Sequence, residues 1–230
     1  MAIIIPHRFI DRLVPDKKIK FIDSIIIGTF NPGLPIIRSL SADELQLYEQ
    51  IQFKKKFQKF NEVKNFYDRP QNRFWKIMDV MANPHFYCNS KDFKEKNRTG
   101  LKYYSKLDRE LIFRNQTEFC KQRGILITDI VRQIEPTSFD KIYDNFPDTM
   151  IERSASIWNT EGILSVIKKY NPKRILINFS LSQSLPKISE EINKIRDKYP
   201  EKVVHVMSTS GAAANNYIAL VNYWHPIFKN

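Results

Sequence analysis

The stretch Ser24-Ile25-Ile26-Ile27-Gly28-Thr29-Phe30-Asn31-Pro32-Gly33 decides how the rest of the chain is interpreted. Its run of β-branched isoleucines stops at a glycine, a polar segment and a Pro-Gly pair. That pattern favours a strand buried on both faces, followed by a tight loop. In open α/β sheets ligands bind beyond the carboxyl ends of such strands. We therefore expect Asn31 to stand at the mouth of a pocket.

Strand-like and helix-like segments alternate along the rest of the chain. Three further apolar runs predict strands, at 124–131, 173–179 and 203–207. Helical spacing and helix-stop residues predict helices at about 42–60, 72–82, 109–123, 159–170, 185–199 and from 217 onward. Ser41 precedes Glu44 by three residues, the spacing of a capping box at the start of the first of them. The segment 132–158 is expected to be mostly loop. Alternating strands and helices imply an α/β fold, a three-layer α/β/α sandwich around a mostly parallel sheet of about four strands.

Length and composition indicate one folded domain. The 230 residues fit a single domain better than two, with residues 1–23 as an N-terminal cap or arm. Hydrophobic residues make up 42% and aromatic residues 13%, which is typical of globular rather than disordered chains. Cys88 and Cys120 are the only cysteines, too few for a disulfide framework or a four-cysteine iron–sulfur cluster.

Targeting signals are not evident. The apolar residues 3–5 meet Pro6 at once, which leaves no room for the core of a signal peptide, and no apolar run approaches membrane-spanning length. We expect a soluble intracellular protein, cytoplasmic or associated with the nucleoid, that acts as a monomer. His85 and Cys88 have metal-ligand spacing, but no second pair completes a site, so neither a metal nor another cofactor is expected.

The charge balance favours polyanionic partners. Lys and Arg number 37 against 25 Asp and Glu, a net charge of +12, which suggests nucleic acid before a membrane surface. A skewed base composition of the genome is an alternative cause of this positive charge. Lys54, Lys55 and Lys56 are interleaved with aromatic residues, which suits a surface that follows a phosphate backbone, although a solvated helix face would carry the same residues.

Two loops at strand ends are expected to meet at one edge of the sheet. The loop 28–33 offers a polar side chain and glycines, and 208–215, after the last strand, offers hydroxyls, backbone amides and small residues. Together they suit a pocket for a planar polar ligand. Asp129 lies near the carboxyl end of another predicted strand, where polar groups are functional more often than on a sheet face, although it could equally cap a following turn.

Three segments in order resemble motifs of the uracil-DNA glycosylase superfamily. They are Gly28-Thr29-Phe30-Asn31-Pro32-Gly33, Asn72-Arg73-Phe74-Trp75 and Ser208-Thr209-Ser210-Gly211-Ala212-Ala213-Ala214-Asn215. The similarity covers about residues 22–216 and is nearest to the mismatch-specific thymine/uracil and the hypoxanthine glycosylases. It implies an enzyme that flips a damaged or mismatched base out of DNA and hydrolyses its N-glycosidic bond.

The resemblance makes Asn31 and Ser208 the catalytic candidates. Asn31 would position the attacking water, while Ser208 would hold the phosphate backbone beside the lesion, and positioning can supply much of the rate. Substrate-binding roles fall to Gly28, Thr29, Phe30, Pro32, Gly33, Asn72, Arg73, Phe74 and Trp75. Phe74 could stack on the flipped base. DNA-binding roles fall to Thr209, Ser210, Gly211, Asn215, Lys54, Lys55 and Lys56.

The chain also departs from the family pattern. Met207 precedes Ser208 where several branches have a histidine, and His205 lies two residues further back, inside the predicted strand. Alanines follow Gly211 where some branches insert a larger wedge into the duplex. No lysine occupies either strand-end loop, so a Schiff-base lyase step is not suggested.

Simpler interpretations remain open at each position. Asn31 could only brace its turn, Phe74 and Trp75 could be core residues, and 208–210 could cap a helix. Two other functions also fit: a non-catalytic module that binds nucleic acid or nucleotides, and an enzyme that acts on free nucleosides or nucleotides.

Overall fold

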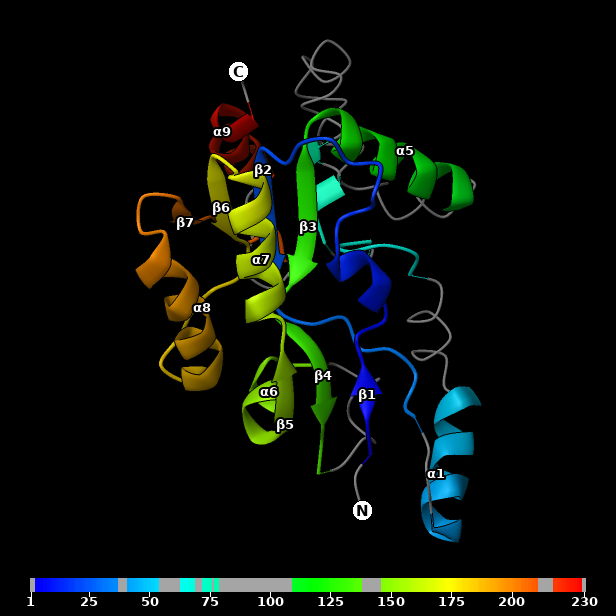
Figure 1. Ribbon diagram of the computed structural model, residues 1–230. Helices are drawn as coiled ribbons and strands as arrows, with labels where there is room; N and C mark the ends of the chain where they lie inside the picture. The colour runs from blue at the N-terminus through cyan, green and yellow to red at the C-terminus, as the bar shows by residue number, and fades with distance from the viewer. Residues whose placement is uncertain are drawn as a thin grey trace.

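The computed structural model describes residues 3–36, 41–53, 63–68, 72–75, 77–78, 109–137, 146–210 and 217–228. Within these residues the strands form two sheets, one parallel and one antiparallel, which meet where the chain passes from one to the other after Asp129 (Figure 1).

The parallel sheet is built around the isoleucine run. β2 (Ser24–Gly28) lies between β3 (Ile125–Asp129) and β6 (Arg174–Ile177), and β7 (Val203–His205) pairs with β6 at the edge. The order β3-β2-β6-β7 confirms the expected α/β fold with a four-stranded parallel sheet. The chain adds β3 on one side of β2 and later β6 on the other. Folds with such a reversal bind ligands at that point, beyond the strands' carboxyl ends.

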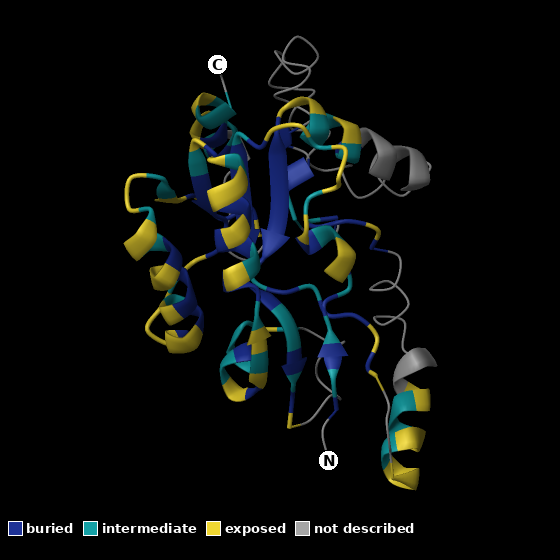
Figure 2. Ribbon diagram, in the orientation of Figure 1, coloured by how far each residue is buried: buried dark blue, intermediate teal, exposed yellow. Residues whose placement is uncertain are grey.

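Helices cover both faces of this sheet, as expected for three layers. They are α7 (Thr160–Tyr170) and α8 (Pro186–Lys198) on one face, and α5 (Arg109–Gln122) and α9 (Tyr217–Phe228) on the other. The side chains of β2 alternate between these faces. Ile25 and Ile27 join the cluster of α7 and α8, whereas Ile26 joins the cluster of α9. All three are fully buried, each worth about 1.5–3 kcal/mol of stabilisation (Figure 2).

The segment 132–158 corrects the prediction of mostly loop. It contains β4 (Val131–Glu135), which starts one residue earlier, α6 (Thr149–Arg153) and β5 (Ala155–Trp158). β4 pairs antiparallel with β5 on one side and with β1 (Ile5–Pro6) on the other. These strands are short and half exposed, so they lack the continuous apolar run that marks β2.

The predicted strand 124–131 is therefore also corrected. Only Ile125–Asp129 belongs to the parallel sheet, and Val131 already starts β4 in the other sheet. Main-chain amides of Ile130 and Val131 donate to the carbonyl oxygens of Gly28 and Thr29, at 2.9 Å and 3.2 Å. The junction between the sheets is thus held against the end of β2.

The helix predictions agree with the described segments. α1 (Ala42–Phe53) covers the start of the predicted helix 42–60, whose remainder lies outside the described residues. Ser41 and Glu44 form the expected capping box, with Ser41 N–H donating to Glu44 Oε2 at 2.9 Å. Helices α5, α7 and α8 begin and end within one residue of their predicted bounds, and α9 begins where predicted. Of 72–82, residues 72–75 and 77–78 are described, and 74–75 and 77–78 are helical.

The N-terminal segment consists of β1, at the edge of the antiparallel sheet, and the 3₁₀ helix η1 (Ile10–Leu13). Ile5 and Leu13 are buried, so the segment packs on the body of the protein as a cap. Of the described helices, none has both the length and the apolar character needed to cross a membrane.

Candidate functional site

Asn31 lies in the loop after β2, and the N-terminal segment holds that loop in place. The Arg8 amide donates to the main-chain oxygen of Asn31 at 2.7 Å, and the Gly33 amide donates to that of Pro6 at 2.8 Å. A β-carbon on Gly33 would come within 2.9 Å of the Pro6 oxygen, so glycine permits this approach. The Asn31 side chain is half-buried, and so remains partly accessible at the strand's carboxyl end.

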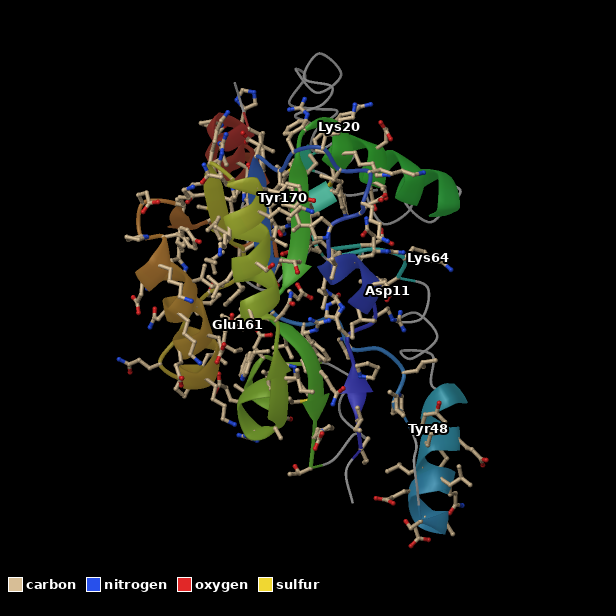
Figure 3. The ribbon with its side chains drawn as sticks, viewed as in Figure 1. Asp11, Lys20, Tyr48, Lys64, Glu161 and Tyr170 are labelled. Atoms are coloured by element: carbon tan, nitrogen blue, oxygen red, sulfur yellow. The ribbon has the colours of Figure 1, made fainter. Side chains whose placement is uncertain are left out.

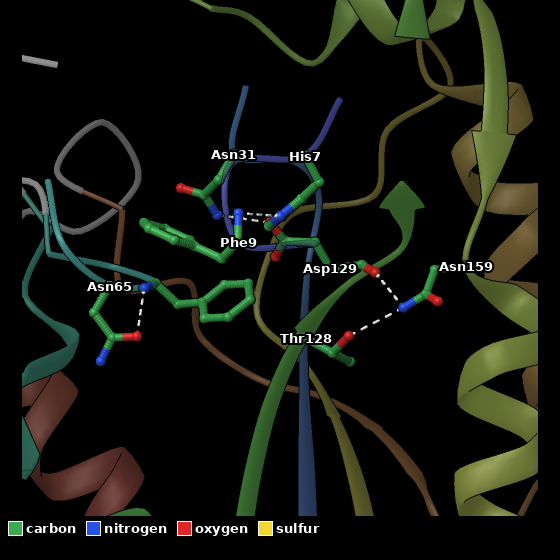
Figure 4. A network of polar contacts seen from close by, with 8 residues as sticks. His7, Phe9, Asn31, Asn65, Thr128, Asp129 and Asn159 are labelled. Carbon is green, nitrogen blue, oxygen red and sulfur yellow. Dashed lines mark hydrogen bonds and ion pairs between the residues drawn. The ribbon is translucent and has the colours of Figure 1, made fainter. Parts of the chain in front are cut away.

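A buried polar network joins Asn31 to two residues from elsewhere in the chain. Asp129 Oδ2 accepts a hydrogen bond from His7 Nε2 at 2.7 Å and another from Asn31 Nδ2 at 2.6 Å (Figure 4). His7 and Asp129 are 2% and 1% exposed. One carboxyl oxygen therefore ties together the N-terminal segment, the end of β2 and the end of β3.

The hydrogen-bond pattern sets the tautomer of His7. The Phe9 main-chain amide donates to His7 Nδ1 at 3.0 Å, so this nitrogen carries a lone pair. The proton of the neutral ring is then on Nε2, where it donates to Asp129 Oδ2. Each bond of the network thus has one donor and one acceptor.

Asn159 holds the main chain at Asp129 in place. It follows β5, and its Nδ2 donates to the main-chain oxygen of Asp129 at 3.0 Å and to Thr128 Oγ1 at 3.1 Å. Its own main-chain amide donates to the Ile130 oxygen at 2.7 Å. Asn159 is buried, so these bonds are shielded from water and hold the end of β3 in position.

The segment 63–68 covers the other side of the site. Arg12 Nη1 donates to the Lys64 main-chain oxygen at 2.5 Å, so this segment lies against η1. The labelled Asp11 and Lys64 mark this side of the molecule in Figure 3. The segment brings Tyr67 over the end of β2, where a β-carbon on Gly28 would stand 2.8 Å from Tyr67 Oη.

Tyr67 carries two unfavourable features. Its φ of 57° lies in the left-handed region, which a bulky residue seldom adopts. Its Oη and Asp129 Oδ1 are both buried without a hydrogen-bond partner among the described residues. Burial and the neighbouring Asp129 raise the pKa of Tyr67 well above its usual value, an effect that Asn178 opposes. The hydroxyl therefore stays protonated, between Asp129 and Asn178.

A second buried pair links the ends of β6 and β7. Asn178 Nδ2 donates to Thr209 Oγ1 at 3.0 Å, and the Thr209 amide donates to Asn178 Oδ1 at 3.1 Å. The Arg73 amide donates to the Thr209 main-chain oxygen at 3.0 Å. The second and third motifs of the sequence are thus in direct contact, and Tyr67 lies between them and the first.

No protein-family model, curated protein or solved structure matches this chain. The likeness to uracil-DNA glycosylases therefore remains a resemblance of the three sequence motifs.

The predicted aromatic residues are core residues in this structure. Phe74 is fully buried between Tyr67, Trp75 and Trp224, with ring centroids 4.8–5.8 Å apart. Trp75 is 6% exposed, and its Nε1 donates to the Phe66 main-chain oxygen. Their positions therefore favour the packing interpretation over direct contact with a base.

The remaining residues of the first two motifs are mostly structural in their contacts. Phe30 is buried, with its ring centroid 5.6 Å from that of His7. Pro32 is buried beside His7, with which it forms an isolated β-bridge. Asn72 Oδ1 accepts from the Phe74 amide at 2.9 Å, as in a helix cap. Arg73 is half-buried, and its Nη1 has no partner among the described residues.

The third motif is described from Ser208 to Ser210. Ser208 is buried and its Oγ accepts from the Ser210 amide at 3.2 Å, Thr209 is fully buried, and Ser210 is exposed. Of these residues Ser210 alone presents an exposed hydroxyl. The predicted DNA-binding residues Gly211, Asn215, Lys54, Lys55 and Lys56 lie outside the described residues, as do His85 and Cys88.

Sequence reasoning missed three residues of the site. His7 had no visible partner, Tyr67 was one aromatic among many, and Asn178 was only a polar residue at a strand end. The position of Asn178 was a usable signal, because polar residues at the carboxyl ends of parallel strands converge. His205, which precedes the third motif, is exposed on edge strand β7 and contacts Arg196 rather than the site.

Proposed function

We propose that this chain is a monofunctional DNA glycosylase, an intracellular base-excision repair enzyme that works as a monomer and removes uracil, hypoxanthine or a related base. One observation carries the proposal. Asn31 stands half-buried at the carboxyl end of β2 with its NH₂ group bonded to buried Asp129, which leaves its amide oxygen to accept a hydrogen bond. An acceptor fixed in this way suits the orientation of a water molecule.

The reaction is a hydrolysis. The water held by Asn31 attacks C1′ of the deoxyribose, the C1′–N bond breaks, and its electron pair leaves with the base. The water's proton passes to the departing base or to solvent, which gives a free base and an abasic sugar. Since the sugar already has oxocarbenium character when the bond breaks, a neutral amide that positions the water suffices.

The surroundings of Asn31 support a nucleic-acid substrate. The half-buried Arg73 belongs to the second motif and the exposed Ser210 to the third, and the chain carries a net charge of +12. In the proposed complex Ser210 and the amides near it contact the phosphate backbone, and the loop 28–33 contacts the flipped base.

Oligonucleotides that carry uracil, hypoxanthine or a G·T pair, single- and double-stranded, test the proposal. After incubation, abasic sites are revealed by alkaline cleavage. Asn31→Ala should lower the rate about 100-fold or more, whereas Asn193→Ala, an exposed asparagine on α8, should not change it. The proposal fails if the intact protein releases no base and Asn31→Ala is indistinguishable from it.

A non-catalytic binding module is the second candidate. Phe74 and Thr209 are both fully buried, so neither is poised to receive a flipped base or a phosphate. This function predicts salt-sensitive binding to single-stranded or abasic DNA without base release.

A further inference from the structure

We infer that His7 and Asp129 are positioning residues, which fix the Asn31 amide so that its oxygen, rather than its NH₂ group, faces the substrate. The kinetic consequence rests on the proposed glycosylase function. The orientation itself does not, and it can be tested separately.

The orientation of the Asn31 amide follows from the hydrogen-bond donors and acceptors around Asp129. Asp129 Oδ2 accepts a hydrogen bond from His7 Nε2, so it also acts as an acceptor toward Asn31. Only the Nδ2 end of the Asn31 amide can donate to it. A flipped amide would set two acceptor oxygens 2.6 Å apart, which is repulsive. In Figure 4 the Asn31 oxygen accordingly points away from Asp129.

His7 is needed because Asp129 could otherwise turn. The carboxyl group lies 1% exposed at the end of β3, and its hydrogen-bond donors in the described part of the chain are His7 and Asn31. His7 is itself held by the Phe9 amide on Nδ1 and by the 5.6 Å edge contact of its ring with Phe30. The bond from His7 therefore restricts rotation of the carboxyl group and keeps one of its oxygens directed at Asn31.

The consequence is that residues near the N-terminus belong to the active site. Without His7 and Asp129 the two orientations of the Asn31 amide differ little in energy, and the flipped one presents the NH₂ group, which cannot accept a hydrogen bond from water. A water molecule would then be misplaced even though Asn31 is present.

Nuclear magnetic resonance of the ¹⁵N-labelled protein tests the geometry without any activity. The His7 ring should show the neutral tautomer with the proton on Nε2, and the Asn31 NH₂ signal should be shifted downfield and protected from exchange. The shift should persist in Asp129→Asn and be lost in Asp129→Leu. A proton on Nδ1 of the neutral ring, or an Asn31 signal unchanged in Asp129→Leu, overturns the inference.

Kinetics test the consequence through matched pairs of variants. Asp129→Leu and His7→Leu should lower kcat about 10- to 100-fold with KM little changed, whereas Asp129→Asn and His7→Gln, which keep an acceptor and a donor, should stay within a few-fold of wild type. In the Asn31→Ala background Asp129→Leu should add nothing, since the group it positions is gone. The positioning role is contradicted if kcat falls equally in the leucine variants and in the conservative variants. It is also contradicted if the effects of Asp129→Leu and Asn31→Ala on kcat add in the double variant.

The two proposals fail in different ways. If the wild-type protein releases no base, the glycosylase function is wrong, and the His7 and Asn31 signals alone decide the orientation. If base release occurs but the leucine variants are as active as wild type while their melting temperatures are unchanged, the function stands and the positioning inference is wrong.

Discussion

The hydroxyl of Tyr67 lies where a side chain on Gly28, the last residue of β2, would begin. A β-carbon at position 28 would stand 2.8 Å from Tyr67 Oη and would overlap Asp129 Oδ1. Both neighbours are held by their surroundings, so Gly28→Ala should destabilise the fold by about 1–3 kcal/mol, the usual cost of overpacking. Urea unfolding followed by circular dichroism measures this loss.

The Tyr67→Phe background provides the control for this contact. Removing Oη leaves Asp129 Oδ1 as the main obstacle, so Gly28→Ala should cost less in that background than in the wild type. The same cost in both backgrounds would show that the two residues do not touch in solution.

Tyr67→Phe should by itself stabilise the protein at neutral pH. It removes a buried hydroxyl that lacks a partner among the described residues, and such a group costs about 1–3 kcal/mol. We expect Tyr67→Phe to raise the free energy of unfolding by about 1 kcal/mol, because the ring at position 67 keeps its contact with Phe74. Destabilisation by Tyr67→Phe would instead indicate a hydrogen bond to Oη.

The raised pKa of Tyr67 also predicts that the protein loses stability at alkaline pH. Burial and the nearby Asp129 raise the folded-state pKa of Tyr67 well above 10.0. Below pH 10 the hydroxyl is protonated in both states, so it does not affect stability there. At higher pH the unfolded chain ionises first, so the wild type should lose stability more steeply than Tyr67→Phe. The free energy of unfolding is measured with urea at several pH values above 10. If it falls equally steeply with pH in the wild type and in Tyr67→Phe, the pKa of Tyr67 is not raised.

The stability of the protein should also depend on the ionisation of Asp23 at acid pH. Partial burial alone would raise the pKa of its carboxyl group, but the hydrogen bonds from Lys173 and Ser24 and the charges of Lys173 and Arg174 outweigh it, so the pKa lies below 3.8. These ion pairs join the starts of β2 and β6. The stabilisation is present above pH 4 and disappears as the pH falls through the folded-state pKa.

Asp23→Asn should accordingly lower the free energy of unfolding by about 1 kcal/mol at pH 7 and much less at pH 2. Asp16→Asn is the matched control, because the ion pair of Asp16 with Lys121 lies on the surface and should matter less. A loss from Asp23→Asn that does not vary with pH would contradict the ion-pair explanation.

The sequence predicted the parts of the fold that carry strong local signals. The isoleucines of β2, the helical stripe of α8 and the capping box at Ser41 each lie where the pattern indicated. The small antiparallel sheet was missed because β4 and β5 are half exposed and gain stability by pairing with each other and with β1, which no local pattern records.

The site was only half predictable for the same reason. Asn31 and the motif loops stand out because glycine, proline and small polar residues cluster at strand ends. The bond from His7 to Asp129 spans 122 positions, and that from Asn31 to Asp129 spans 98. Partners so distant in sequence leave no spacing to detect. Phe74 resembled a stacking residue, yet its surroundings make it core.

Thr209 and Ser210 should separate stability from DNA contact. Thr209 is fully buried with its hydroxyl bonded to Asn178, so Thr209→Val should cost about 1–2 kcal/mol in urea unfolding. Ser210 is exposed, so Ser210→Ala should leave stability within about 0.5 kcal/mol while weakening binding to a lesion-bearing oligonucleotide, measured by fluorescence anisotropy at two salt concentrations. If Ser210→Ala leaves affinity unchanged, this loop does not hold the phosphate backbone through its exposed hydroxyl, and the proposed DNA contact must come from elsewhere on the chain.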